Sequence, residues 1–241
     1  MQKNTTNLTH KRVLGVAIPI VLANATIPIL GAVDTAVVGQ LGLAVPIGAV
    51  GIGAIIITAI YWLFGFLRMG TTGLTAQAIG SGDKSETSAL LVRGIIIGLV
   101  AGLILIIAQV PLFLGALQVS PASIEVEGLA QKYLQIRVYS APAAIALFGI
   151  TGWLIAKEKT RAVLILQLLL NGINIILDLV FVLELGWGVE GVAIATVIAE
   201  WSGLIFSFGL PGKGLIMVTG KTGFKFSIEL ALFRWLRLIV T

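Results

Sequence analysis

The sequence predicts an all-α integral membrane protein, a bundle of six transmembrane helices, and three observations support this class. Hydrophobic residues make up 58% of the 241-residue chain and charged residues only 11%, whereas soluble domains carry roughly a quarter charged residues. The mean hydropathy is +1.06. The apolar residues form long blocks of about the 20 residues that a helix needs to cross a bilayer. Lipid is therefore the expected solvent of most of the chain.

These blocks divide the chain into three regions. Residues 1–12 are a polar N-terminal segment, residues 13–210 a six-helix transmembrane lobe, and residues 211–241 a linker with an amphipathic segment. The expected spans cover residues 14–38, 46–67, 90–116, 133–156, 162–183 and 189–210. The first block follows Lys11 and Arg12 and is too long for the hydrophobic region of a secretory signal, so we expect it to be retained. Gly42 and Pro46 mark the turn after it.

The basic residues predict how the helices are oriented. With six spans, all of the 16 Lys and Arg residues except Lys132 and Arg137 fall on one side of the membrane. Basic loops face the cytoplasm, so both termini of this multi-pass membrane protein are expected there. The segment from Phe224 to Ile239 is too charged to span and is expected to lie on the cytoplasmic surface.

Composition also excludes several kinds of site. The chain has no cysteine, which rules out disulfides, thiol catalysis and Cys-ligated metals. The net charge of +5 resides in loops, so a nucleic-acid partner is not expected. The single His10 lies in the polar N-terminal stretch and is interpreted as solvated.

Three acidic residues, Asp34, Asp178 and Glu200, fall inside apolar spans. A carboxylate in that position costs at least about 2.5 kcal/mol, so it needs a partner, a proton or a watery cavity. Glu200 has two interpretations, a relay group and a helix-packing residue facing the cytoplasm.

A polar stripe marks the fifth span, because Gln167, Asn171, Asn174 and Asp178 recur at intervals of a helical turn. Such a stripe faces protein or water. Gln167 and Asn171 have a second interpretation, hydrogen-bonded contact between helices.

Helix rise predicts which polar residues share a depth in the membrane. At about 1.5 Å per residue, Asp178 lies about 25 Å from Arg161, Asp34 lies in the same outer half, and Thr196 lies about 9 Å from the outer surface. Two close carboxylates in a low dielectric cannot both ionise cheaply, so one holds a proton or a cation lies between them. Asn174 and Thr196 can supply neutral oxygens for Na⁺. The predicted site is therefore Asp34, Asn174, Asp178 and Thr196.

Several segments resemble the multidrug and toxic compound extrusion (MATE) family, and its DinF-type bacterial branch in particular. The segments are Val33 to Gly39, Arg68 to Gln77, Ile136 to Ala143 with Gly152 to Leu154, Asn171 to Asp178, and Gly191 to Thr196. Of these, Arg68 to Gln77 is expected to be the loop after the second span. The resemblance covers most of residues 10 to 210 and depends on the order and spacing of these segments.

The resemblance implies a secondary antiporter that exports organic, often cationic, compounds in exchange for H⁺ or Na⁺, without a cofactor. It implies two six-helix lobes, of which this chain is the N-terminal one, and it associates the coupling cation with Asp34, Asn174, Asp178 and Thr196. The segment from Phe224 would be the elbow before a missing second lobe. Where some relatives carry an Asn in the fourth span, the nearest residues here are Phe148 and Thr151, which favours H⁺ over Na⁺.

Three other functions are alternatives. A flippase for a lipid-linked substrate would favour cationic residues inside the cavity, and the middle portions of the predicted spans contain none. An aspartyl protease dyad of Asp34 and Asp178 lacks the expected flanking residues, so no enzyme activity is expected. A non-transporting lobe that pairs with a second copy would form oligomers, since one lobe alone would expose a polar wall to lipid. The sequence identifies neither the exported compound nor the coupling ion.

Overall fold

The computed structural model describes residues 9–119 and 122–209, and these residues form helices and short connections. The linker and amphipathic segment predicted within residues 211–241 lie outside the described residues. The elements in chain order are α1 (His10–Gly39), α2 (Ala44–Trp62), α3 (Gly65–Gly80), α4 (Lys84–Ile107), α5 (Gln109–Val119), α6 (Ile124–Arg137), η1 (Val138–Ser140), α7 (Ala141–Ala156), α8 (Thr160–Asp178), η2 (Leu179–Glu184) and α9 (Gly188–Ser207).

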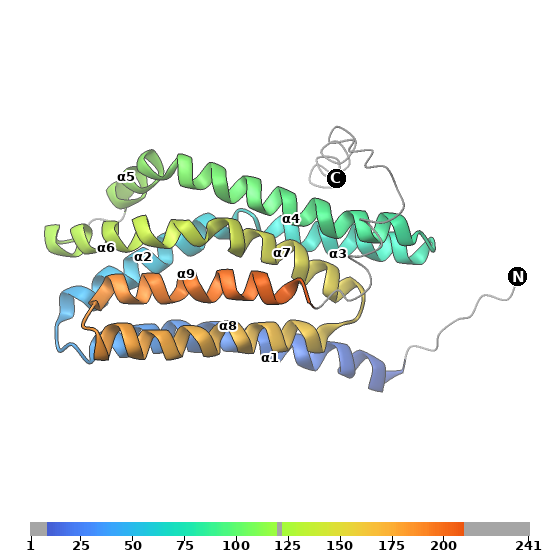
Figure 1. Cartoon of the computed structure of the whole chain (residues 1–241), viewed down its shortest axis with the longest axis horizontal. Coiled ribbons are helices and arrows are strands. Elements are labelled where there is room, and N and C mark those ends of the chain that lie inside the picture. The colour runs from blue at the N-terminus through green and yellow to red at the C-terminus, as the bar shows by residue number, and fades with distance from the viewer. Residues whose placement is uncertain (1–8, 120–121, 210–241) are drawn as a thin grey trace, which may run out of the picture.

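The described residues contain six helical segments that are long and apolar enough to cross a membrane, which confirms the predicted fold class. They are His10–Gly39, Ala44–Gly80, Lys84–Ile107, Ile124–Ala156, Thr160–Glu184 and Gly188–Ser207. They run alternately up and down in one bundle, so α1 begins and α9 ends at the same end of it (Figure 1). The turns that precede α2 and α9 lie at the opposite end, where α6 also begins.

Three predicted spans have clearly different boundaries in the structure. The second continues through α3 to Gly80, with a short break around Phe64, so Arg68 to Gln77 are helical and are not a loop. The third covers Lys84–Ile107 in place of residues 90–116, and the fourth begins at Ile124 rather than at residue 133. Apolar windows underestimate a helix whose hydrogen bonds continue into polar sequence. Because the fourth span starts earlier, Arg137 lies well inside it and not near its outer end.

The fourth span is the centre of the bundle and α1 its least buried helix. The second half of the fourth span, α7, packs against α3 and α4 through small residues. A Cβ atom added at Gly98 would lie 2.4 Å from the Ala146 backbone, and one at Gly102 would lie 2.2 Å from Pro142 N. Small residues let helix backbones approach closely where lipid offers no hydrophobic driving force. This packing fixes the scaffold around which α1, α8 and α9 are arranged.

A tight turn places α9 antiparallel to α8. After Asp178 the helix widens into the π-helical segment η2, and Gly186 and Gly188 follow with positive φ angles of 68° and 53°. The Trp187 N–H donates to the Phe181 carbonyl at 2.8 Å, and the two rings stack with centroids 4.9 Å apart. Glycine adopts such φ values without strain. The turn therefore brings the polar positions of α9 back beside those of α8.

Candidate functional site

Asp34, Asn174, Asp178 and Thr196 lie together in the bundle. Asp34 comes from α1, Asn174 and Asp178 are one turn apart on α8, and Thr196 comes from α9. Asn174 and Asp178 are fully buried, and Asp34 and Thr196 expose only 9% and 6% of their surface. Helical periodicity and estimated depth predicted the same four residues to converge. This side-chain set is called the carboxylate site below.

The Asn174 amide bridges the other three members. Its nitrogen donates to Asp34 Oδ1 and Asp178 Oδ2, both at 3.1 Å, and its oxygen accepts from Thr196 Oγ1 at 3.0 Å and from the Thr196 backbone N–H at 3.3 Å. An amide nitrogen is a donor and a carboxylate oxygen an acceptor, so this bridge suits ionised carboxylates.

The two carboxyl groups lie close to each other, because Asp34 Oδ1 and Asp178 Oδ2 are each 3.1 Å from the same Asn174 nitrogen. Asp178 Oδ1 is buried without a hydrogen-bond partner in the described part of the chain. Two adjacent carboxylates at low dielectric repel strongly, and a shared proton or a cation removes that repulsion. The arrangement can therefore take up one positive charge.

Gln167 and Asn171 do not join this site. Gln167 Nε2 donates to Asn171 Oδ1 at 2.9 Å, and Asn171 Nδ2 donates to the Thr26 carbonyl of α1 at 3.3 Å. Both side chains thus connect α8 to α1, which is the helix-contact interpretation. Thr151 likewise uses its hydroxyl within its own helix, donating to the Leu147 carbonyl at 2.7 Å.

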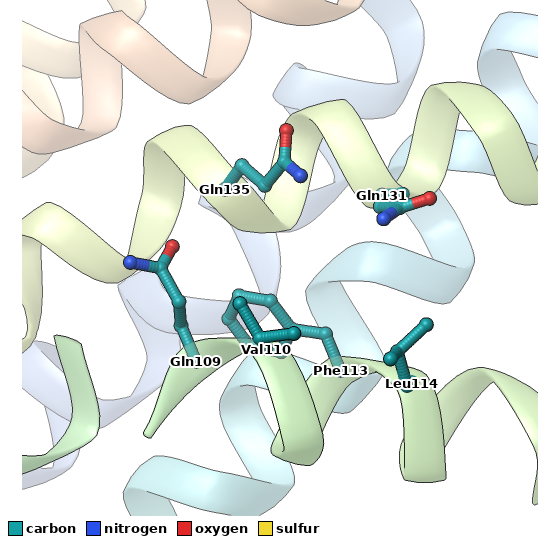
Figure 2. A pocket seen from close by; sticks show the side chains of 6 residues that line it. All are labelled: Gln109, Val110, Phe113, Leu114, Gln131 and Gln135. Carbon is teal, nitrogen blue, oxygen red and sulfur yellow. The ribbon is translucent and has the colours of Figure 1, made fainter. Parts of the chain in front are cut away.

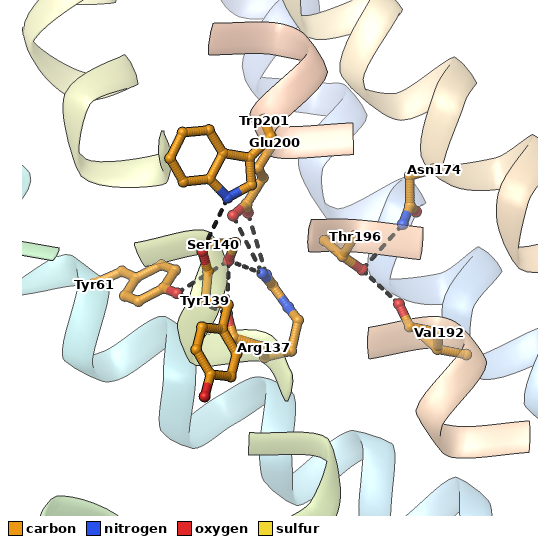
Figure 3. A network of polar contacts seen from close by, with 9 residues as sticks. All are labelled: Tyr61, Arg137, Tyr139, Ser140, Asn174, Val192, Thr196, Glu200 and Trp201. Atoms are coloured by element: carbon orange, nitrogen blue, oxygen red, sulfur yellow. Dashed lines mark hydrogen bonds and ion pairs between the residues drawn. The ribbon is translucent and has the colours of Figure 1, made fainter. Parts of the chain in front are cut away.

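Glu200 forms a partly buried ion pair that the sequence did not predict. Its carboxylate accepts from Arg137 Nη1 and Nη2, both at 3.2 Å, and the two side chains expose 19% and 10% of their surface. Arg137 Nη1 also donates to Ser140 Oγ at 2.5 Å. Figure 3 shows Thr196 facing Asn174 and Glu200 facing Arg137. Since Thr196 and Glu200 are one turn apart on α9, the ion pair adjoins the carboxylate site.

The break in the fourth span holds Arg137 in place. Tyr61 of α2 donates to the Arg137 carbonyl at 3.2 Å and lies 3.1 Å from Ser140 Oγ. Trp201 of α9 donates to the Tyr139 carbonyl at 2.9 Å. Carbonyls freed by a break need such donors inside a membrane. The sequence contains a signal for this ion pair. An arginine beside an apolar block needs an acidic partner, and Glu200 is an acidic residue inside an apolar span for which the sequence alone indicates no partner.

Within the described residues, no group of three or more His, Cys, Asp and Glu side chains could hold a metal ion. The carboxylate site offers two acids, one amide and one hydroxyl, a set suited to a proton or a monovalent cation. A separate cavity of about 70 Å³ lies between α5 and α6 (Figure 2). Gln109, Val110, Phe113, Leu114, Gln131 and Gln135 line it, and none of these residues belongs to the carboxylate site.

Comparison with known proteins gives consistent matches over most of the chain. The family model MatE matches residues 19–180. DNA damage-inducible protein F of Escherichia coli (strain K12) is 39% identical over 210 residues, which cover 87% of this chain and 44% of that protein. The chain thus spans about half the length of this relative.

Solved structures share the fold. A MOP superfamily transporter from Pyrococcus furiosus superposes with a TM-score of 0.81 at 22% identity, covering 95% of this chain and 51% of that one. An outward-facing multidrug resistance MATE family transporter superposes with a TM-score of 0.80 at 23% identity, with 95% and 51% covered. In each case the six-helix bundle corresponds to about half of the solved chain.

Proposed function

The chain belongs to the MatE family, and from this premise we propose that it is the N-terminal, cation-binding lobe of an antiporter that exports organic or cationic compounds in exchange for H⁺ or Na⁺. The observation that carries the proposal is the carboxylate site, where two buried acids share an amide bridge between three helices. Uptake or release of one positive charge there changes how α1, α8 and α9 attract one another. That change is the physical basis for coupling ion movement to conformation.

The proposed location is the bacterial inner membrane, with both termini in the cytoplasm. The partner is a second six-helix lobe or a second copy of the chain. Support comes from the length covered in the relatives, and from the wide exposure of apolar side chains such as Ile27, Ile29 and Ile176 on α1 and α8. In this proposal the transporter needs no cofactor besides the coupling ion.

Single substitutions in a two-lobed transporter that carries this chain as its N-terminal half test the proposal. Asp34→Asn and Asp178→Asn keep the side-chain size but remove the ionisable group, so each should abolish ion-driven export of a fluorescent cation while membrane levels stay normal. Asp83→Asn is the matched control, because Asp83 is exposed and only caps α4, a role that Asn also performs. Full export by both site variants would reject the assignment.

A flippase for a lipid-linked substrate is the alternative transport function, and the sequence argues against it because no cationic residue is expected in the middle of a span. The structure corrects this for Arg137, which lies well inside the fourth span. The correction does not favour a flippase, since the guanidinium is held by Glu200 and the side chain of Arg137 is only 10% exposed. An open cationic surface for an anionic headgroup requires an arginine without such a partner. The non-transporting alternative predicts stable oligomers of the isolated chain, which mass measurement in detergent detects.

A further inference from the structure

Arg137 is a full positive charge inside the membrane-spanning bundle next to the carboxylate site. Its partner Glu200 is one helical turn from Thr196 on α9. Tyr133, one turn earlier on α6, is buried, and the Tyr61 hydroxyl contacts the Arg137 carbonyl and Ser140 Oγ. Among the described residues named here, the charged groups are three acids, Asp34, Asp178 and Glu200, and one arginine, and charges in a low dielectric act on one another strongly.

The hydrogen bonds of Arg137 leave part of its donor capacity unused. Its Nη atoms bind Glu200 and Ser140, while Nε is buried without a hydrogen-bond partner among the described residues. Asp178 Oδ1 is a buried acceptor in the same condition. A cationic donor without a partner and a carboxyl oxygen without a partner attract each other, and leaving either of them buried and unpaired is unfavourable.

We propose that Arg137 is the internal counter-cation of the carboxylate site, a positioning residue that competes with the coupling ion for Asp34 and Asp178. Glu200 holds the guanidinium one helical turn from Thr196 when the site carries its ion. When the ion leaves, the negative charge of the two acids draws Arg137 toward Asp178. This inference rests on the proposed function and applies equally to H⁺ and Na⁺, because a fixed charge opposes either cation by the same electrostatic term.

The test measures ion uptake by the 241-residue chain reconstituted in lipid. Infrared difference spectroscopy records the protonated carboxyl band as the bath pH varies, with and without Na⁺. Loss of the band in Asp34→Asn and in Asp178→Asn assigns it. The midpoint is the proton or Na⁺ concentration at which the band has changed by half. The double variant R137M/E200Q removes the competing cation together with its partner acid, so we expect this midpoint concentration to fall on the order of tenfold.

Two further variants separate this role from a merely structural one. Glu200→Gln releases Arg137 from its partner, so the midpoint should move the opposite way, toward higher ion concentration. Arg137→Lys retains the charge but cannot form the two-point contact with Glu200, so its midpoint should lie closer to that of the unmodified chain than the midpoint of R137M/E200Q does. If R137M/E200Q does not fold, the shift in Glu200→Gln relative to Arg137→Lys decides the question alone.

Equal midpoints in all forms, or shifts of Glu200→Gln and R137M/E200Q in the same direction, would overturn the role of Arg137. That failure is distinguishable from failure of the proposed function. A band that responds to ions but has an unmoved midpoint rejects only the counter-cation. A band that responds to neither pH nor Na⁺ in any form rejects the carboxylate site as a cation site.

Discussion

At the scale of residues, Thr196 has the smallest side chain in the carboxylate site and one of the clearest roles. Its hydroxyl lies 3.0 Å from the Asn174 amide and donates to the amide oxygen, which leaves the amide nitrogen for the two acids. The hydroxyl thereby supports the orientation of the bridge. Its neighbour one turn away, Glu200, serves the adjacent ion pair instead.

Thr196→Val should therefore weaken ion uptake while leaving the fold intact. Valine has nearly the same shape but cannot pair with Asn174, and one buried hydrogen bond is worth about 1 kcal/mol, or about fivefold in affinity. The midpoint of the carboxyl band, measured as above, checks this expectation. Thr196→Ser keeps the hydroxyl and is the matched control, so equal effects of the two substitutions would contradict the role given to the hydroxyl.

The four members of the carboxylate site could be predicted from the sequence because each lies on a regular helix. Period and rise then determine face and depth, as they do for Asn174 and Asp178. Arg137 could not be placed the same way, since its position depends on where the fourth span starts and where it breaks. Both are decided by tertiary hydrogen bonds from Tyr61 and Trp201, which no local pattern encodes.

At the scale of elements, α4 and α7 pack closely together. Among the described glycines, an added Cβ atom comes nearest to a neighbouring atom at Gly102 of α4, 2.2 Å from Pro142 N of α7. Gly98 and Gly102 face Ala146 and Pro142 with no room for a methyl group. Trp153 of α7 adds a hydrogen bond from its indole N–H to the Thr87 carbonyl of α4 at 2.8 Å. This pair of helices is the rigid support behind the break that carries Arg137.

Gly102→Ala should destabilise the bundle by about 1–3 kcal/mol, because the added Cβ would overlap backbone atoms that cannot move independently. Gly51→Ala is the control: nothing lies within 4 Å of its added Cβ, and alanine favours helix over glycine. Thermal aggregation of the detergent-solubilised protein, followed by size-exclusion chromatography, compares the two. A Gly102→Ala variant as stable as the Gly51→Ala variant would show that the helices can separate.

At the scale of the whole molecule, the up-and-down order of the spans was predictable because it follows from hydropathy alone. The structure adds that the turns before α4 and α8 share the end of the bundle where α1 begins (Figure 1). Lys84 and Lys159 adjoin these turns. By contrast, hydropathy does not distinguish the apolar surface that meets lipid from the apolar surface that would meet the proposed second lobe.

Fusions to alkaline phosphatase test the predicted orientation. The enzyme is active only outside the cytoplasm, so fusions after Gly42 or Gly186 should be active and fusions after Gly82 or Glu158 inactive. The reverse pattern would mean that the basic loops face outward. A mixed pattern would show that one of the six segments does not cross the membrane.

The position of Thr196 and Glu200 on a single face of α9 has a consequence for how this protein can vary. A residue inserted between Gly191 and Thr196 would rotate both side chains by about 100° and remove the hydroxyl and the partner of Arg137 in one step. A substitution can change one function at a time, but a change of length here cannot. Insertions and deletions in functional relatives are therefore expected in the turns, such as the one at Gly186, and not in this helix.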